Sequence, residues 1–153
     1  MKDIEVRFLA MEYYLLILNR TYEVTLDKNG VHGAVVSQLM SSVNPKIASA
    51  TESGNAYDLV PQSYVIKSRK FVAGSGEYLK QSRSNFSFNS DSVLSINYDP
   101  SKKWGMGPVP HTGKLYVTVK PNVTHELIVL GNPNITELLN GIELAGFPVE
   151  KRT

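Results

Sequence analysis

Residues 22–36 carry the sequence YEVTLDKNGVHGAVV, the strongest secondary-structure signal in the chain. From Tyr22 to Leu26, apolar and polar side chains alternate, as they do along a β-strand with one buried face. The pair Asn29-Gly30 then supplies two residues that tolerate positive φ, and a second β-rich run, Val31–Val36, follows directly. Two such runs around an Asn-Gly pair predict a β-hairpin.

Toward the C-terminus, further patterns predict more strands. Residues 86–88 form the tip of one strand, and the Asn, Ser and Asp side chains of 89–92 are typical of a turn. Apolar and polar side chains alternate in 93–98 and again in 114–120, whereas 126–130 is almost continuously apolar. We therefore expect two half-buried strands and one more deeply buried strand, paired as an antiparallel sheet.

An amphipathic helix is predicted after these strands, over Ile135–Leu144. Asn134 is a favourable N-cap, and Glu137 follows three residues later, the spacing of a capping box. Gly146 and Pro148 then end the helix. Its apolar residues recur at i, i+3, i+4 and i+7 and so share one face: Ile135, Leu138, Leu139 and Ile142.

Two patterns compete in the N-terminal segment. Residues 4, 6 and 8 alternate as in a strand, but residues 9, 13, 16 and 17 fall at helical spacing, and we favour a helix from Val6 to Leu18. The apolar run Phe8–Leu18 is shorter than the roughly 20 residues that span a bilayer. Acidic residues precede it (Asp3, Glu5) and interrupt it (Glu12), which argues against a signal peptide. So apolar a segment must be covered, by its own domain or in a homo-oligomer.

The middle section, residues 44–76, gives the weakest signals. Small and polar residues in 48–55 predict a mobile loop, and 57–64 and 64–71 suggest short strands. A turn is expected at 74–76, which reads Gly-Ser-Gly. Together these elements predict one α+β domain over residues 1–153, built as an antiparallel sheet or partly open barrel with a C-terminal helix.

Composition excludes several kinds of chemistry. The chain has 153 residues and no cysteine, which rules out disulfides, thiolate metal ligands and a cysteine nucleophile. A protein without disulfides fits the cytoplasm, where we expect this one. Its formal net charge of +2 is too small for a dedicated nucleic-acid-binding protein, so we do not expect a nucleic-acid partner.

The order of hairpin strands followed by one amphipathic helix resembles that of bacterial pleckstrin-homology-like domains. The resemblance rests on 93–98, 114–120, 126–130 and the helix Ile135–Leu144. It implies a binding module rather than an enzyme. Some members bind phosphoinositides through basic residues on the loop of the first hairpin. Here that loop, 27–30, holds a single lysine beside an aspartate, so this activity is not expected.

The loop 99–113 is the first candidate contact surface. It holds the only tryptophan, Trp104, with three prolines and three glycines, and loops of this length are often functional. A rigid loop that closes over the core is the structural alternative. The functional hypothesis is a contact site for a protein partner, built on Trp104 and His111 with Lys102 and Lys103 beside them.

A second hypothesis is a protein that binds and sequesters a small anionic molecule or nucleotide. Its basic and aromatic pocket would combine the 99–113 residues Lys102, Lys103, Trp104 and His111 with Lys67 and Arg69, which would share a face of the strand 64–71. The three histidines, at 32, 111 and 125, show no metal-ligand spacing, although they could converge in space. No serine lies in a nucleophile-elbow motif, and we expect no cofactor and no metal site.

Overall fold

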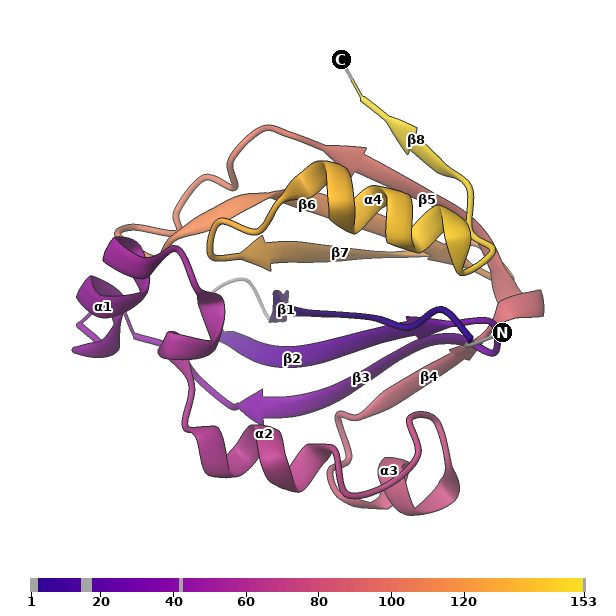
Figure 1. The fold of residues 1–153 in the computed structure, drawn as a ribbon, viewed down its shortest axis with the longest axis horizontal. Coiled ribbons are helices and arrows are strands. Elements are labelled where there is room, and N and C mark those ends of the chain that lie inside the picture. The colour runs from indigo at the N-terminus through magenta and orange to yellow at the C-terminus, as the bar shows by residue number, and fades with distance from the viewer. Residues whose placement is uncertain (1–2, 15–17, 42, 153) are drawn as a thin grey trace.

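The computed structural model describes residues 3–14, 18–41 and 43–152, which fold as α+β (Figure 1). One eight-stranded sheet runs in the order β4-β3-β2-β1-β7-β6-β5-β8. Every neighbouring pair is antiparallel except β5 and β8. The strands are β1 (Val6–Tyr14), β2 (Leu18–Asp27), β3 (Gly30–Ser37), β4 (Phe86–Asn89), β5 (Val93–Asp99), β6 (His111–Val119), β7 (Val123–Leu130) and β8 (Val149–Lys151).

The predicted hairpin is confirmed as β2 and β3. Asp27 pairs with Gly30 at its tip, and the Asp27 carboxylate accepts hydrogen bonds from the backbone N–H groups of Asn29 (2.9 Å) and Gly30 (3.2 Å). The strands predicted at 86–88, 93–98, 114–120 and 126–130 are present as β4 to β7, with the 3₁₀ turn η2 (Ser90–Ser92) between β4 and β5.

The N-terminal helix prediction is wrong, because Val6–Tyr14 forms strand β1 between β2 and β7. Residues 15–17 of the predicted helix lie outside the described residues. Phe8 and Ala10 are buried on one face of the sheet, whereas Leu9 and Met11 are buried on the other. A strand buried on both faces is apolar at every position, which imitates a buried helix. Residues 8–11 are thus covered within the chain itself and offer no oligomer interface.

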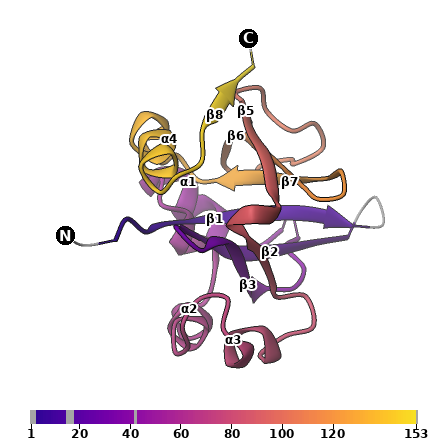
Figure 2. The same ribbon diagram turned by 90° about the vertical axis from the view of Figure 1, so that its right-hand side faces the viewer.

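The sheet is strongly curved but is not a closed barrel. The ring of Phe88 on β4 lies 4.7 Å from the ring of His125 on β7, centroid to centroid. These strands are four positions apart in the sheet, a separation of about 19 Å if the sheet were flat. The half formed by β1 to β4 therefore folds toward the half formed by β5 to β7, with a shared apolar core between them. Figure 2 shows β1 to β3 between α4 on one side and α2 and α3 on the other.

The C-terminal helix is confirmed as α4 (Ile135–Leu144). The Asn134 side chain accepts a hydrogen bond from the Glu137 N–H (3.1 Å), as the capping motif predicts. Leu138, Leu139 and Ile142 are buried in the core between the two halves of the sheet. Helix α4 lies close to β1, because a Cβ at Gly141 would come within 2.8 Å of the Val6 side chain.

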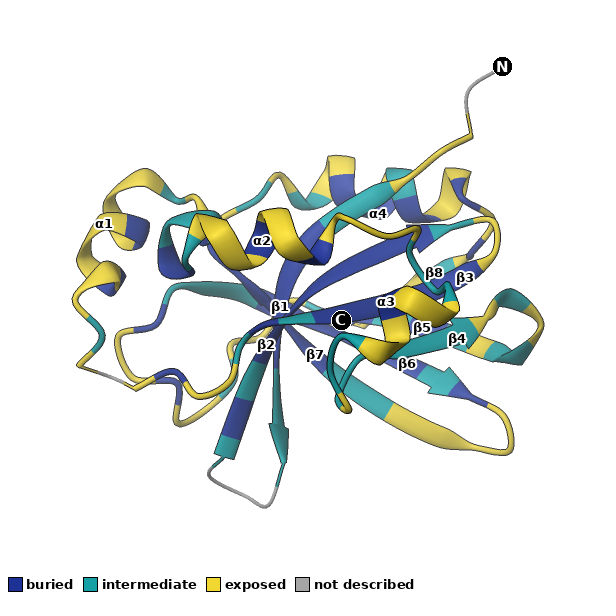
Figure 3. Cartoon of the chain, turned by 90° about the horizontal axis from the view of Figure 1, so that it is seen from below, coloured by how far each residue is buried: buried dark blue, intermediate teal, exposed yellow. Residues whose placement is uncertain are grey.

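The middle section is helical, so the predicted loop at 48–55 and strands at 57–64 and 64–71 are wrong. It forms α1 (Lys46–Ser53), the 3₁₀ turn η1 (Ala56–Leu59), α2 (Gln62–Ser68) and α3 (Gly76–Lys80). The Asn55 side chain accepts a hydrogen bond from the Tyr57 N–H and starts η1. Buried residues such as Ile47, Ala50 and Val65 cover the face of the sheet opposite α4 (Figure 3). No helix in the described ranges is long and apolar enough to cross a membrane.

Candidate functional site

A hollow of about 790 Å³ lies beside the 99–113 loop, on the face of the sheet opposite α4. Its apolar part comes from β1, from Met40 after β3 and from the loop itself, with Met11, Met40, Met106 and Val109 all buried. Tyr13 and Tyr116 add aromatic walls, and the Tyr13 hydroxyl lies 3.3 Å from the Met106 sulfur. Pockets that take small organic molecules share this size and this mixture of apolar and polar groups.

Trp104 also lines the hollow, yet it is 94% exposed. The other large apolar residues of its loop, Met106 and Val109, are buried. Trp104 is therefore not the residue with which the loop covers the core. A tryptophan that is left in water beside a hollow is available to contact a ligand or partner.

Three lysines line the hollow in different electrostatic settings. The Lys103 ammonium forms an ion pair of 2.7 Å with Glu126, whose carboxylate also accepts a hydrogen bond from the Tyr116 hydroxyl (3.0 Å). Lys114 is buried on β6, where its ammonium lies 3.6 Å from the carboxylate of Asp99. Lys102 is exposed and forms no ion pair or side-chain hydrogen bond with the described residues.

Asp99 and Ser101 hold Lys114 at the base of the loop. The Ser101 hydroxyl donates to the Asp99 carboxylate (2.7 Å), and the Lys114 ammonium donates to the Ser101 oxygen (3.0 Å). Hydrogen bonds from the Ser101 hydroxyl and backbone N–H, together with the charge of Lys114, lower the pKa of Asp99 below its ordinary value. Asp99 therefore stays ionised and balances the charge of Lys114 at neutral pH.

The His111 ring holds two parts of the loop together by hydrogen bonds. Its Nδ1–H donates to the Val109 carbonyl (3.0 Å), and its Nε2 accepts from the Lys103 backbone N–H (3.1 Å). Both ring nitrogens are thus used within the chain, in the neutral form that has its proton on Nδ1. Within the chain, His111 therefore positions the loop.

We expect His111→Phe to loosen the loop without unfolding the protein. The substitution removes the acceptor for the Lys103 N–H, and one such hydrogen bond contributes about 1 kcal/mol, or roughly fivefold in an opening equilibrium. Amide hydrogen exchange at Lys103 should accelerate by about that factor, whereas exchange in α4 should not change. Lys102→Gln is the matched control, since the Lys102 side chain bonds to none of the described loop residues. Unchanged exchange at Lys103 in His111→Phe would contradict this role.

The predicted pocket residues do not meet at one place. Lys102, Lys103 and Trp104 line the large hollow, and His111 is bonded to the Lys103 backbone N–H without lining the hollow. Lys67 lines a separate hollow of about 270 Å³ between α2 and β3, and Arg69 forms an ion pair with Glu23. The stripe expected from Lys67 and Arg69 does not exist, because they belong to the end of a helix and not to a strand.

The hollow also has residues that the sequence did not single out. Tyr13, Lys114, Tyr116 and Glu126 come from β1, β6 and β7. Lys114 and Tyr116 alternate with Leu115 and Val117, which marks them as one face of a strand but does not show what covers that face.

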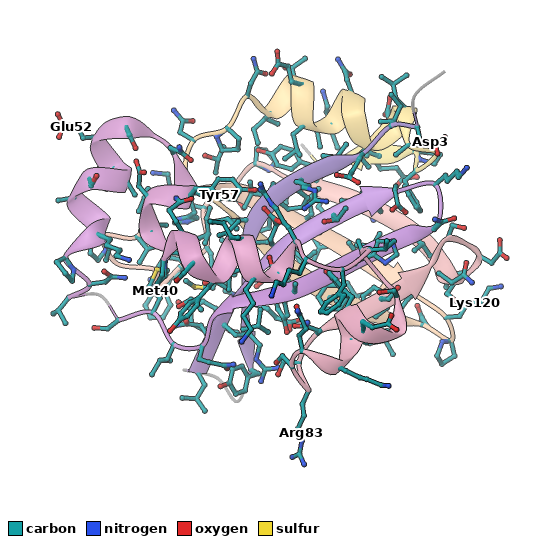
Figure 4. The ribbon with its side chains drawn as sticks, turned by 60° about the horizontal axis from the view of Figure 1, so that its bottom comes forward. Asp3, Met40, Glu52, Tyr57, Arg83 and Lys120 are labelled. Carbon is teal, nitrogen blue, oxygen red and sulfur yellow. The ribbon has the colours of Figure 1, made fainter. Side chains whose placement is uncertain are left out.

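Glu23 is the centre of a buried ion cluster between the sheet and α2. Its side chain is 3% exposed, and both carboxylate oxygens accept from Arg69, at 2.9 and 2.6 Å. Arg7 (3.2 Å) and the Tyr57 hydroxyl (2.7 Å) complete the cluster. Tyr57 lies on η1, over the face of the sheet that the middle section covers (Figure 4). Burial by itself would raise the pKa of Glu23, but these hydrogen bonds and charges outweigh it and lower the pKa.

Ser87, His32 and Asp27 align like a catalytic triad but pack as a structural cluster. The Ser87 hydroxyl lies 2.7 Å from His32 Nδ1, and His32 Nε2 lies 3.1 Å from the Asp27 carboxylate. In the serine hydrolases, Nε2 of the histidine faces the serine and Nδ1 faces the carboxylate. Here the two ring nitrogens are exchanged. Gly74 packs directly against the pair, since a Cβ there would lie 2.7 Å from Nδ1 and 2.9 Å from the Ser87 oxygen. The cluster joins β4 and the turn before α3 to the β2–β3 hairpin.

The remaining histidine belongs to a third, separate cluster. His125 Nδ1 lies 3.4 Å from one carboxylate oxygen of Glu12, and the Tyr22 hydroxyl donates to the other at 3.3 Å. Burial raises the pKa of Tyr22 to about 12, so its hydroxyl remains protonated. The three histidines therefore do not converge, and the described residues contain no group of three or more His, Asp or Glu side chains that could hold a metal ion.

No family model, no curated protein and no solved structure matches the chain.

Proposed function

We propose that the protein is a non-enzymatic binding module of the pleckstrin-homology-like type, with its contact surface at the 99–113 loop and the adjoining hollow. The observation that carries the proposal is Trp104, 94% exposed at the wall of a hollow of about 790 Å³. Tryptophan is one of the residue types that most often dominate the energy of a binding interface.

The fold is consistent with this type of module. Antiparallel strands joined in hairpins form a curved sheet, and one amphipathic helix, α4, follows β7 and packs on the core. In this chain the segment from α1 to α3 is an addition between β3 and β4. Because one fold serves many functions, the proposal rests on the site and not on the topology.

The loop is suited to binding because it is already positioned. His111 holds both Lys103 and Val109, and Gly131 N–H donates to the Pro110 carbonyl (2.9 Å). Met106 and Val109 anchor the loop in the core. Little conformational entropy is therefore lost when a ligand meets Trp104.

The second candidate function, sequestration of a small molecule or nucleotide, uses the same surface. The size of the hollow and the exposed ammonium group of Lys102 favour it. It differs from the first in its ligand, because a protein partner would lie over Trp104 whereas a small molecule would enter the hollow.

Trp104 provides a direct test of the proposal. As the only tryptophan and an exposed one, it should emit like a tryptophan in water and be quenched freely by acrylamide. We expect one class from a panel of anionic vesicles, nucleotides, sugar phosphates and aromatic acids to shift this emission to the blue and to protect it. Calorimetry with Trp104→Ala should then show affinity for that compound reduced by about thirtyfold, the effect of a strong interface residue.

Leu144→Ala is the matched control, since Leu144 is 71% exposed on the far face of α4. It should leave binding unchanged. A compound that binds Trp104→Ala as tightly as the natural protein would place the contact surface elsewhere and refute the proposal.

A further inference from the structure

The charges of the hollow are almost balanced within the chain. Of the three lysines that line it, Lys103 is paired with Glu126 at 2.7 Å, and Lys114 is paired with Asp99. Only Lys102 forms no ion pair with any described residue. The residues that line the hollow therefore offer one positive charge without an ion pair, that of Lys102 at the exposed edge. Arg152 does not line the hollow, and its guanidinium lies over the Tyr116 ring, 4.2 Å from the centroid.

A polyphosphate does not fit this charge pattern. Glu126 lines the hollow, so each further negative charge of a ligand would approach a carboxylate as well as an ammonium group. Lys103 could turn toward such a ligand only by giving up its 2.7 Å ion pair. A ligand with a single negative charge meets Lys102 without that loss.

The rest of the hollow favours a flat apolar body. Trp104 and Tyr13 supply aromatic faces, which pack against planar rings, whereas Arg152 covers one face of the Tyr116 ring. Met11 and Met106 add thioether side chains, which adapt to the edges of aromatic groups. The volume of about 790 Å³ accommodates a molecule with one or two fused rings.

From this combination we infer that the hollow binds a small aromatic monocarboxylate, with its ring between Trp104 and the buried methionines and its carboxylate at Lys102. This inference rests on the proposed binding function and specifies the ligand class. It distinguishes that class from the nucleotides that the three lysines alone would suggest.

The test uses three probes on the full chain: 2-naphthoate, its neutral isostere 2-naphthamide, and ADP as a polyanion. Calorimetry should show that naphthoate binds about fivefold more tightly than naphthamide, the value of one exposed charge pair. ADP should bind no better than naphthamide. Lys102→Gln should lower the affinity for naphthoate to that for naphthamide, and it should leave the affinity for naphthamide unchanged.

Lys120→Gln is the matched control for the loss of one exposed lysine. Lys120 follows β6, and Figure 4 shows it at the opposite end of the molecule from Met40, which lines the hollow. This control variant should bind naphthoate like the natural protein. An equal loss in both variants would mean that only net charge matters, and it would overturn the inference.

Failure of the inference and failure of the proposed function give different results. The inferred ligand class is overturned if naphthamide or ADP binds as tightly as naphthoate. It is also overturned if none of the three probes binds. In either case the binding function survives if another compound is bound in a manner sensitive to Trp104→Ala. Naphthoate binding that is unchanged in Trp104→Ala and in Lys102→Gln locates the site elsewhere and overturns both.

Discussion

Ile142→Ala is expected to lower the free energy of unfolding by about 3–4 kcal/mol, the usual cost of deleting a fully buried aliphatic side chain. Ile142 is 0% exposed, at the centre of the face that α4 presents to the core. Gly141 brings this turn of the helix against Val6 on β1, so the neighbouring backbone leaves little freedom to close the cavity. Urea unfolding followed by circular dichroism measures the difference.

Leu144→Ala on the same helix is the control for this prediction. Both substitutions replace a branched aliphatic residue with alanine and change helix propensity little. Leu144 is 71% exposed, so its variant should lose less than about 1 kcal/mol. Similar losses in the two variants would mean that α4 does not pack on the sheet through Ile142.

The parts of the fold that the sequence predicted well have a local cause. The β2–β3 hairpin follows from alternation around Asn29-Gly30, and α4 follows from the Asn134 cap and an apolar face. Each of these signals lies within about 15 residues and fixes a local conformation without help from the rest of the chain.

The errors arise where tertiary burial determines the pattern. β1 lies between β2 and β7 and is buried on both faces, so its alternation disappears, and periodicity alone cannot separate it from a helix. α1 and α2 have only 8 and 7 residues. Helices this short are held by packing on the sheet, and their sequences carry little intrinsic preference.

The candidate site was predictable only in part for a similar reason. Trp104 identified the loop 99–113, because a tryptophan among prolines and glycines needs an explanation. The hollow beside it also needs Tyr13 from β1 and Glu126 from β7, which are distant in sequence. Only the pairing of β1 with β7 brings these two residues together, and no local sequence pattern predicts that pairing.

Arg69→Met is the second substitution with a large expected effect. Glu23 is almost completely buried, and Arg69 binds both of its carboxylate oxygens. Removing one partner of a buried ion pair usually costs about 3–5 kcal/mol, because the other charge remains desolvated. The Arg69 side chain is 46% exposed, so solvent screens part of this interaction, and we expect a loss of about 2 kcal/mol. Thermal and urea unfolding at pH 7 measure it.

Tyr57→Phe is the control that separates the charge from the hydrogen bonds of the cluster. It removes the 2.7 Å hydrogen bond to Glu23 and leaves both arginines in place. Tyr57→Phe should lower the free energy of unfolding by about 1 kcal/mol, the contribution of one hydrogen bond. A loss in Arg69→Met no greater than that of Tyr57→Phe would show that the ion pair contributes little to stability.

The pH dependence of Arg69→Met tests the same cluster independently. The native interactions lower the pKa of Glu23, so they contribute stability above the pKa of an unfolded glutamate, about 4.3. That contribution disappears as the pH falls through the lowered native pKa, where the carboxylate takes up a proton.

In Arg69→Met the largest of the hydrogen-bond and charge effects that lower the pKa of Glu23 is absent, so the variant has less stability to lose in acid. The difference between the natural protein and the variant should therefore be greatest near pH 7 and shrink below about pH 4. A difference that stayed constant with pH would assign the effect of Arg69 to packing and not to its charge.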